Sequence, residues 1–97
     1  MASYRTDDFI GSLESKGFVR DTTHHNMFWY YYEGRRTSVR TRTSHGEREF
    51  DDALFHQRRK QMGGLSRKQM NDFIDCPLSA ADYAKHLIGG GLVEPAD

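Results

Sequence analysis

This sequence has few cysteines, no long apolar stretch and no net charge, and each of these absences excludes a class of protein. It holds a single cysteine, Cys76, so an intramolecular disulfide is excluded and a reducing cytoplasm is the favoured compartment. No apolar stretch approaches the length of a membrane helix or a signal-peptide core, which predicts an untargeted soluble protein. The 14 basic residues balance the 14 acidic ones, which argues against a chain that coats nucleic acid indiscriminately.

What is present suffices for one compact core. At 97 residues, with 36% hydrophobic and 12% aromatic residues, the chain can close one hydrophobic core but not two. The charges are distributed unevenly along it. Four arginines and no acid lie between Gly34 and Thr43, whereas acids outnumber bases from Gly63 onward. We therefore expect a local basic surface on a protein that is neutral as a whole.

Changes in hydrophobic period predict an α+β fold. A helix is expected from an N-cap at Thr6 to a stop at Gly17, and an antiparallel meander of three strands follows it. Three further helices are expected, and the first two helices should pack on one face of the sheet. The expected strands are 18–22, 26–33 and 36–43, and the expected later helices are 50–62, one opened by a capping box from Ser66 to Gln69, and one after Ser79.

The expected second and third strands differ in the faces they present. In the third strand, Arg36, Arg40 and Arg42 share one face with Ser38, and Val39 lies on the other, so one face is a basic stripe. The aromatic run 28–32 is apolar on both faces, which indicates helices on one side and an aromatic surface or a partner on the other. The plainer interpretation is a solvated arginine face above a core of aromatic residues.

The histidine pair His24-His25 precedes the aromatic strand. Ribonucleotides carry their own nucleophile, the 2′-hydroxyl, so cleavage needs a base to accept its proton and cations to hold the phosphorane charge. Histidine and arginine suit these two roles, and such a mechanism needs no metal and leaves a 2′,3′-cyclic phosphate. The alternatives are an exposed turn, or a metal site built from the histidines, although no spacing is diagnostic of one. The histidines considered for that site are His24, His25, His45 and His56.

The order of short motifs along the chain resembles the HicA toxins of toxin–antitoxin systems. The motifs are Lys16-Gly17-Phe18, His24-His25, Gly34-Arg35-Arg36, His45-Gly46 and Gly64-Leu65-Ser66. The resemblance covers about Phe9 to Ile74, with Thr22-Thr23 standing where the family has Gly-Ser. It implies the α-β-β-β-α fold of double-stranded RNA-binding domains and a cofactor-free endoribonuclease that cleaves mRNA and is inhibited by a cognate antitoxin protein.

The resemblance also implies roles for particular residues. His24 is expected to be the catalytic general base. The residues expected to bind RNA are His25, Arg35, Arg36, Arg40 and Arg42. A non-catalytic RNA- or protein-binding module of the same fold is the alternative.

The expected domain organisation is a HicA-like domain over residues 1–76 and a helical extension with a flexible tail over residues 77–97. Tyr83 and Leu87, spaced four residues apart, predict that this extension packs on the domain or on a second copy in a homodimer. Its acids, among them Glu94, predict that it does not contact RNA.

Overall fold

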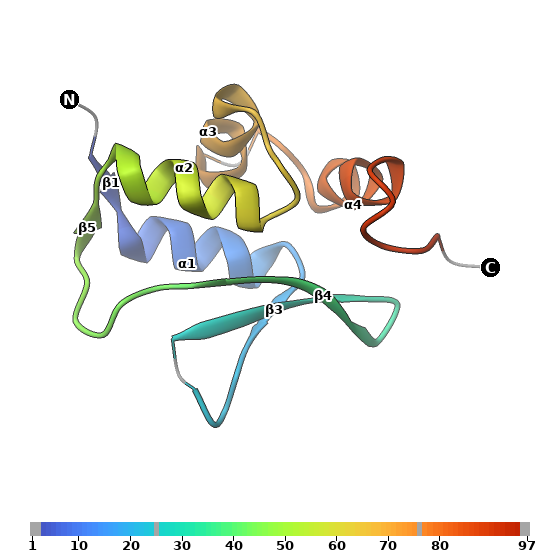
Figure 1. Cartoon of the computed structure of the whole chain (residues 1–97), viewed down its shortest axis with the longest axis horizontal. Coiled ribbons are helices and arrows are strands. Elements are labelled where there is room, and N and C mark those ends of the chain that lie inside the picture. Colours follow the sequence, from blue (N-terminus) through green and yellow to red (C-terminus); the bar gives the residue numbers. More distant parts are fainter. Residues whose placement is uncertain (1–2, 25, 76, 96–97) are drawn as a thin grey trace.

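The computed structural model describes residues 3–24, 26–75 and 77–95, and it has an α+β architecture (Figure 1). The helices of these ranges are α1 (Thr6–Ser15), α2 (Asp52–Gln61), α3 (Arg67–Asp75) and α4 (Ala80–Gly89). The strands are β1 (Tyr4–Arg5), β2 (Phe18–Arg20), β3 (Met27–Tyr32), β4 (Arg35–Arg42) and β5 (Glu49–Phe50). The order β2-β3-β4 forms an antiparallel three-stranded sheet, and β1 pairs with β5 in a separate ribbon.

The predicted antiparallel meander is confirmed, and its register positions the arginines. Met27 pairs with Arg42 at one end of the β3–β4 hairpin, and Tyr32 pairs with Arg35 at the other. The connecting turn is tight, with positive φ at both Glu33 (51°) and Gly34 (76°). The register shifts between Trp29 and Tyr31, so that β4 carries extra residues in the middle of the ladder.

The first helix begins where predicted, but Thr6 is not its cap. Arg5 occupies the N-cap position without a side-chain hydrogen bond, and the Thr6 hydroxyl instead donates to Glu47 at 2.7 Å. The predicted stop at Gly17 is correct, since this residue has φ 109°. A Cβ at Gly17 would lie 2.9 Å from a ring carbon of Tyr30, so close packing as well as backbone conformation requires glycine.

The prediction that α2 starts at Phe50 is wrong. Phe50 lies in β5, opposite Tyr4, and the two rings stack with centroids 5.3 Å apart. Helix α2 starts two residues later, with the Asp51 carboxylate accepting the Leu54 N–H as its cap. A strand of two residues is too short to show an alternating hydrophobic pattern. The helical pattern of the following residues was therefore extended to include Phe50.

The caps of the last two helices agree with the sequence. Ser66 and Gln69 form the predicted reciprocal capping box, with bonds of 2.8 and 3.1 Å. The Ser79 hydroxyl accepts the Asp82 N–H at the start of α4.

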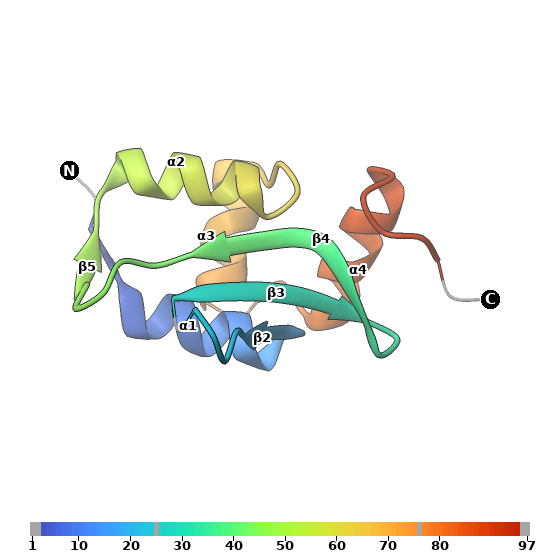
Figure 2. The same ribbon diagram turned by 60° about the horizontal axis from the view of Figure 1, so that its bottom comes forward.

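All four helices contribute to a core on one side of the sheet (Figure 2). Phe28, Tyr30 and Val39 supply its strand side and are buried. Tyr83 of α4 is fully buried, lies in contact with three other rings, and donates its hydroxyl to the Met62 carbonyl at 2.8 Å. The prediction that Tyr83 and Leu87 face inward is therefore confirmed, and the extension after residue 76 shares the core of the domain. Within the described ranges, none of the helices is long and apolar enough to cross a membrane.

Candidate nucleic-acid interface

The face of the sheet opposite the core is open and carries both aromatic and basic side chains. Val19 of β2 is 50% exposed and Tyr31 of β3 is 38% exposed. The basic side chains come from β4, where exposed residues alternate with the buried Val39 and Thr41. The predicted basic stripe is confirmed at Arg36, Arg40 and Arg42, which are all exposed. We call this surface, formed by Val19, Met27, Trp29, Tyr31, Arg36, Ser38, Arg40 and Arg42, the outer sheet face.

Trp29 lies on the central strand of the outer sheet face, and two arginines of β4 lie over its ring. The Arg36 guanidinium carbon lies 4.4 Å from the Trp29 ring centroid, and that of Arg40 lies at 5.2 Å. Cation–π attraction of this kind holds guanidinium groups over a ring without neutralising their charge. Sequence reasoning described both faces of the aromatic run 28–32 as apolar and did not identify Trp29 as the residue that the arginines contact.

Asp21 organises the loop between β2 and β3, and sequence reasoning did not select it. One carboxylate oxygen accepts the backbone N–H groups of Thr23 and His24, at 2.7 and 3.2 Å, and the other accepts the Trp29 indole N–H at 3.3 Å. These hydrogen bonds, the two backbone ones first, hold the pKa of Asp21 below its usual value. An aspartate directly after a strand and before polar residues is the signal that could have identified this turn.

His24 lies in this loop rather than in a strand, because β3 does not begin until Met27. Its carbonyl accepts the Met27 N–H at 2.9 Å, and its side chain is exposed. Within the described ranges its imidazole has no hydrogen bond or ion pair. The His24 side chain is therefore positioned by the loop and not by strand alternation, and His25 lies outside the described residues.

The arginines predicted to bind RNA fall into two groups. Arg42 pairs with Met27 and so lies at the end of the hairpin next to the His24 loop. Arg35 pairs with Tyr32 at the far end, about 17 Å away for five strand steps. Arg36 and Arg40 lie between these ends and share Trp29. The structure thus brings His24 toward Arg42 and Arg40, and it separates Arg35 from them.

The remaining histidines lie elsewhere. Both ring nitrogens of His56 lie 2.9 Å from guanidinium groups, those of Arg59 and Arg67, so the ring is enclosed by cations. His86 contacts the Gly63 carbonyl at 2.8 Å. Over residues 3–24, 26–75 and 77–95, no three side chains of the metal-ligating types lie close enough to hold an ion.

A buried ion pair supports the loop that leads into β5. Arg58 of α2 donates two hydrogen bonds of 2.7 Å to Glu47, and the two side chains are only 3% and 7% exposed. Burial alone would raise the pKa of Glu47, but hydrogen bonds from Arg58, Thr6 and Ser44 outweigh it and lower this pKa to about 2. The Arg58 guanidinium also lies over the Phe50 ring, 4.6 Å from its centroid. This pair joins α1, α2 and the loop, and it takes no part in the outer sheet face.

Comparison with protein-family models, with curated proteins and with solved structures found no match. The class that the geometry itself defines is an α+β domain with an open, cationic and aromatic sheet face, bordered by a loop that displays a histidine.

Proposed function

We propose that this protein is a HicA-like endoribonuclease of the double-stranded RNA-binding-domain fold, and that it binds single-stranded RNA on the outer sheet face. The observation that carries the proposal is that the guanidinium groups of Arg36 and Arg40 both lie over the Trp29 ring. Exposed aromatic rings bind unpaired bases by stacking, and guanidinium groups beside them bind the phosphates between those bases. An aromatic ring that already holds the guanidinium groups in place lowers the entropy lost on binding.

His24 is the general base in this proposal. It accepts the 2′-hydroxyl proton, the 2′-oxygen attacks the adjacent phosphorus, and the bond from phosphorus to the 5′-oxygen breaks. The 5′-oxygen takes up a proton from water, which leaves a 2′,3′-cyclic phosphate and a 5′-hydroxyl. Arg42, at the end of the hairpin next to the His24 loop, and Arg40, two residues before it in β4, stabilise the charge on the phosphorane oxygens. Asp21 is a positioning residue, because it fixes the backbone that carries His24.

The same face would be the target of an inhibitor. An antitoxin protein with an acidic surface could cover Arg36, Arg40 and Arg42 and exclude RNA by occupying their positions. Action on mRNA places the proposed activity in the cytoplasm.

Decay of a long RNA in the presence of excess EDTA tests the proposal. The purified protein is expected to shorten the RNA and to leave cyclic phosphate ends, which resist polyadenylation until acid opens them and a phosphatase then removes the phosphate. An intact RNA, or decay that requires added metal, would reject the proposed chemistry.

A non-catalytic RNA-binding module is the second candidate. The observation favouring it is that, within the described ranges, no side chain orients the His24 imidazole, whereas catalytic bases are commonly held by a third group. Trp29 is the only tryptophan, so its fluorescence reports RNA on the outer sheet face whether or not the RNA is cleaved. Quenching of Trp29 by an RNA that stays intact would identify this second candidate.

A further inference from the structure

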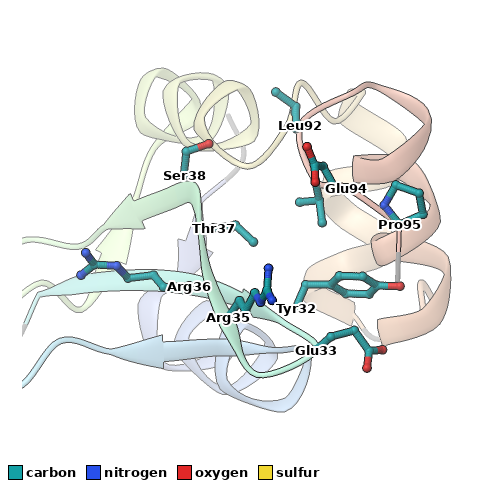
Figure 3. A pocket seen from close by; sticks show the side chains of 10 residues that line it. Tyr32, Glu33, Arg35, Arg36, Thr37, Ser38, Leu92, Glu94 and Pro95 are labelled. Atoms are coloured by element: carbon teal, nitrogen blue, oxygen red, sulfur yellow. The ribbon is translucent and has the colours of Figure 1, made fainter. Parts of the chain in front are cut away.

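A groove of about 520 Å³ lies between the tip of the β3–β4 hairpin and the C-terminal tail (Figure 3). The tail is held in place beside the hairpin, since Val93 is buried and the Leu92 N–H donates to the Leu87 carbonyl at 3.0 Å. The groove therefore depends on the extension that follows residue 76. It is lined by Tyr32, Glu33, Arg35, Arg36, Thr37, Ser38, Leu92, Val93, Glu94 and Pro95.

Charged side chains of both signs line this groove. Arg35 lies beside Tyr32 on the hairpin side, and Glu94 lies across from them on the tail (Figure 3). Arg36, by contrast, directs its side chain away along the hairpin, consistent with its position over Trp29. Within the part of the chain that the structure describes, neither Arg35 nor Glu94 forms an ion pair or a side-chain hydrogen bond. A fitting ligand therefore has an anionic group for Arg35 and hydrogen-bond donors for Glu94.

We infer that the groove binds one unpaired guanine nucleotide of an RNA strand. Its phosphate would bind Arg35, its base would lie against the Tyr32 ring and the half-exposed Leu92, and its Watson–Crick edge would donate to Glu94. Guanine alone presents two adjacent donors, N1–H and N2–H, to a carboxylate. Adenine and cytosine each offer an amino group beside an acceptor nitrogen, and uracil offers one N–H between two carbonyl oxygens, so a carboxylate pairs less well with each of them.

The inference rests on the proposed RNA binding and adds a specificity site to it. Because the groove lies at the end of the hairpin away from His24, the guanine would be held several nucleotides from the bond that is cut. The sequence-based expectation that the extension avoids RNA then applies to α4 and not to the tail. Glu94, expected to repel phosphate, would instead recognise a base.

Amide chemical shifts of the full chain, titrated with guanosine 5′-monophosphate, test the inference. Saturable shifts are expected at the hairpin tip and at residues 92–94, with Trp29 fluorescence unchanged. The other three nucleotide monophosphates, inosine monophosphate and inorganic phosphate serve as comparison ligands. Inosine lacks only the N2 amino group, so weaker binding of inosine monophosphate than of guanosine monophosphate is expected.

Matched variants assign the contacts. Glu94→Gln should weaken guanosine monophosphate binding roughly 5- to 150-fold, the range for losing a bidentate base contact, whereas Glu49→Gln, in an exposed residue of β5 outside the groove, should not. Arg35→Ala should weaken binding of every nucleotide, whereas Arg48→Ala, an exposed arginine next to β5, should leave binding unchanged.

Equal binding of all nucleotides, or of inorganic phosphate alone, would overturn the guanine assignment, as would binding that survives Arg35→Ala. These titrations need no cleavage. Guanosine monophosphate binding by a protein that leaves RNA intact would reject the proposed ribonuclease activity and support the proposed guanine site. RNA decay without guanosine monophosphate binding would reject only the guanine site.

Discussion

At the scale of single residues, Asp21 determines how the His24 loop is held. Its carboxylate accepts three hydrogen bonds, two of them from the backbone around His24. Asp21→Ala should reduce RNA cleavage roughly tenfold to a hundredfold, because a base displaced by about an ångström loses its alignment. The measurement is the initial rate of RNA decay, with circular dichroism confirming the fold. Asp21→Asn keeps one acceptor oxygen and should restore part of the rate; a rate unaffected by Asp21→Ala would remove the positioning role.

Glu47 makes the folded state sensitive to acid. Its pKa is lowered to about 2 in the folded protein, against 4.5 for the ordinary carboxyl group, so the folded state binds its proton less readily than the unfolded state. The stabilisation is present above pH 4.5 and is lost as the pH falls from 4.5 toward 2. Urea denaturation at a series of pH values should show this decrease.

Glu47→Gln supplies the control for that measurement. The variant should be less stable at neutral pH by roughly 3–5 kcal/mol, since it leaves Arg58 buried without its charge partner, and its stability should depend less on pH below 4.5. A variant with the same acid dependence as the original protein would show that another carboxylate is responsible.

At the scale of elements, β4 should govern the electrostatic part of RNA binding. Each phosphate contact contributes about −0.7 to the slope of log affinity against log salt for single strands. Replacing Arg36, Arg40 and Arg42 with alanine should therefore flatten this slope by roughly 2. Trp29 fluorescence, measured with an uncleavable 2′-O-methyl RNA, gives the affinities. An unchanged slope would place the binding surface elsewhere on the molecule.

Helix α4 should be required for stability because its tyrosine fills the core. Tyr83→Ala should cost about 3–5 kcal/mol of unfolding free energy, the range for truncating a buried aromatic ring. Tyr83→Phe keeps the ring and removes only the bond to the Met62 carbonyl, so about 1–3 kcal/mol is expected. A loss below 1 kcal/mol for Tyr83→Ala would show that α4 rests on the surface of the domain.

The sequence predicted most elements because their signals are local. Gly17 and the pair Ser66 and Gln69 specify helix ends within a few residues, and alternation specifies the face of each β4 arginine. The β1–β5 ribbon was not predicted, because each of its strands is only two residues long and it pairs Tyr4 with Phe50, far apart in the sequence. The hydrogen bond from the Thr6 hydroxyl to Glu47 was not predicted either, because the two residues are 41 positions apart in the sequence.

At the scale of the whole molecule, the interface combines features that local sequence signals predict with contacts between residues far apart in the chain. Parity on β3 and β4 could place Trp29 and the arginines on one face, but the register shift that brings both Arg36 and Arg40 over one ring is a property of the folded ladder. The groove could not be predicted at all, because it joins the hairpin tip to a tail some 60 residues later in the chain. The position of His24 in a loop likewise depends on the start of β3 at Met27, and the Asp21 carboxylate before that loop accepts the Trp29 indole N–H across it.

The central claim is that His24 is the base of a metal-independent ribonuclease, and the most direct test compares the original protein with His24→Ala in an RNA-decay assay containing EDTA. The variant should fold normally, because an exposed loop side chain contributes within about 0.5 kcal/mol of stability, and should lose roughly a hundred- to ten-thousand-fold in rate. Expression of the original protein, but not of His24→Ala, should arrest growth. Decay that continues at the original rate in the His24→Ala protein would contradict the account.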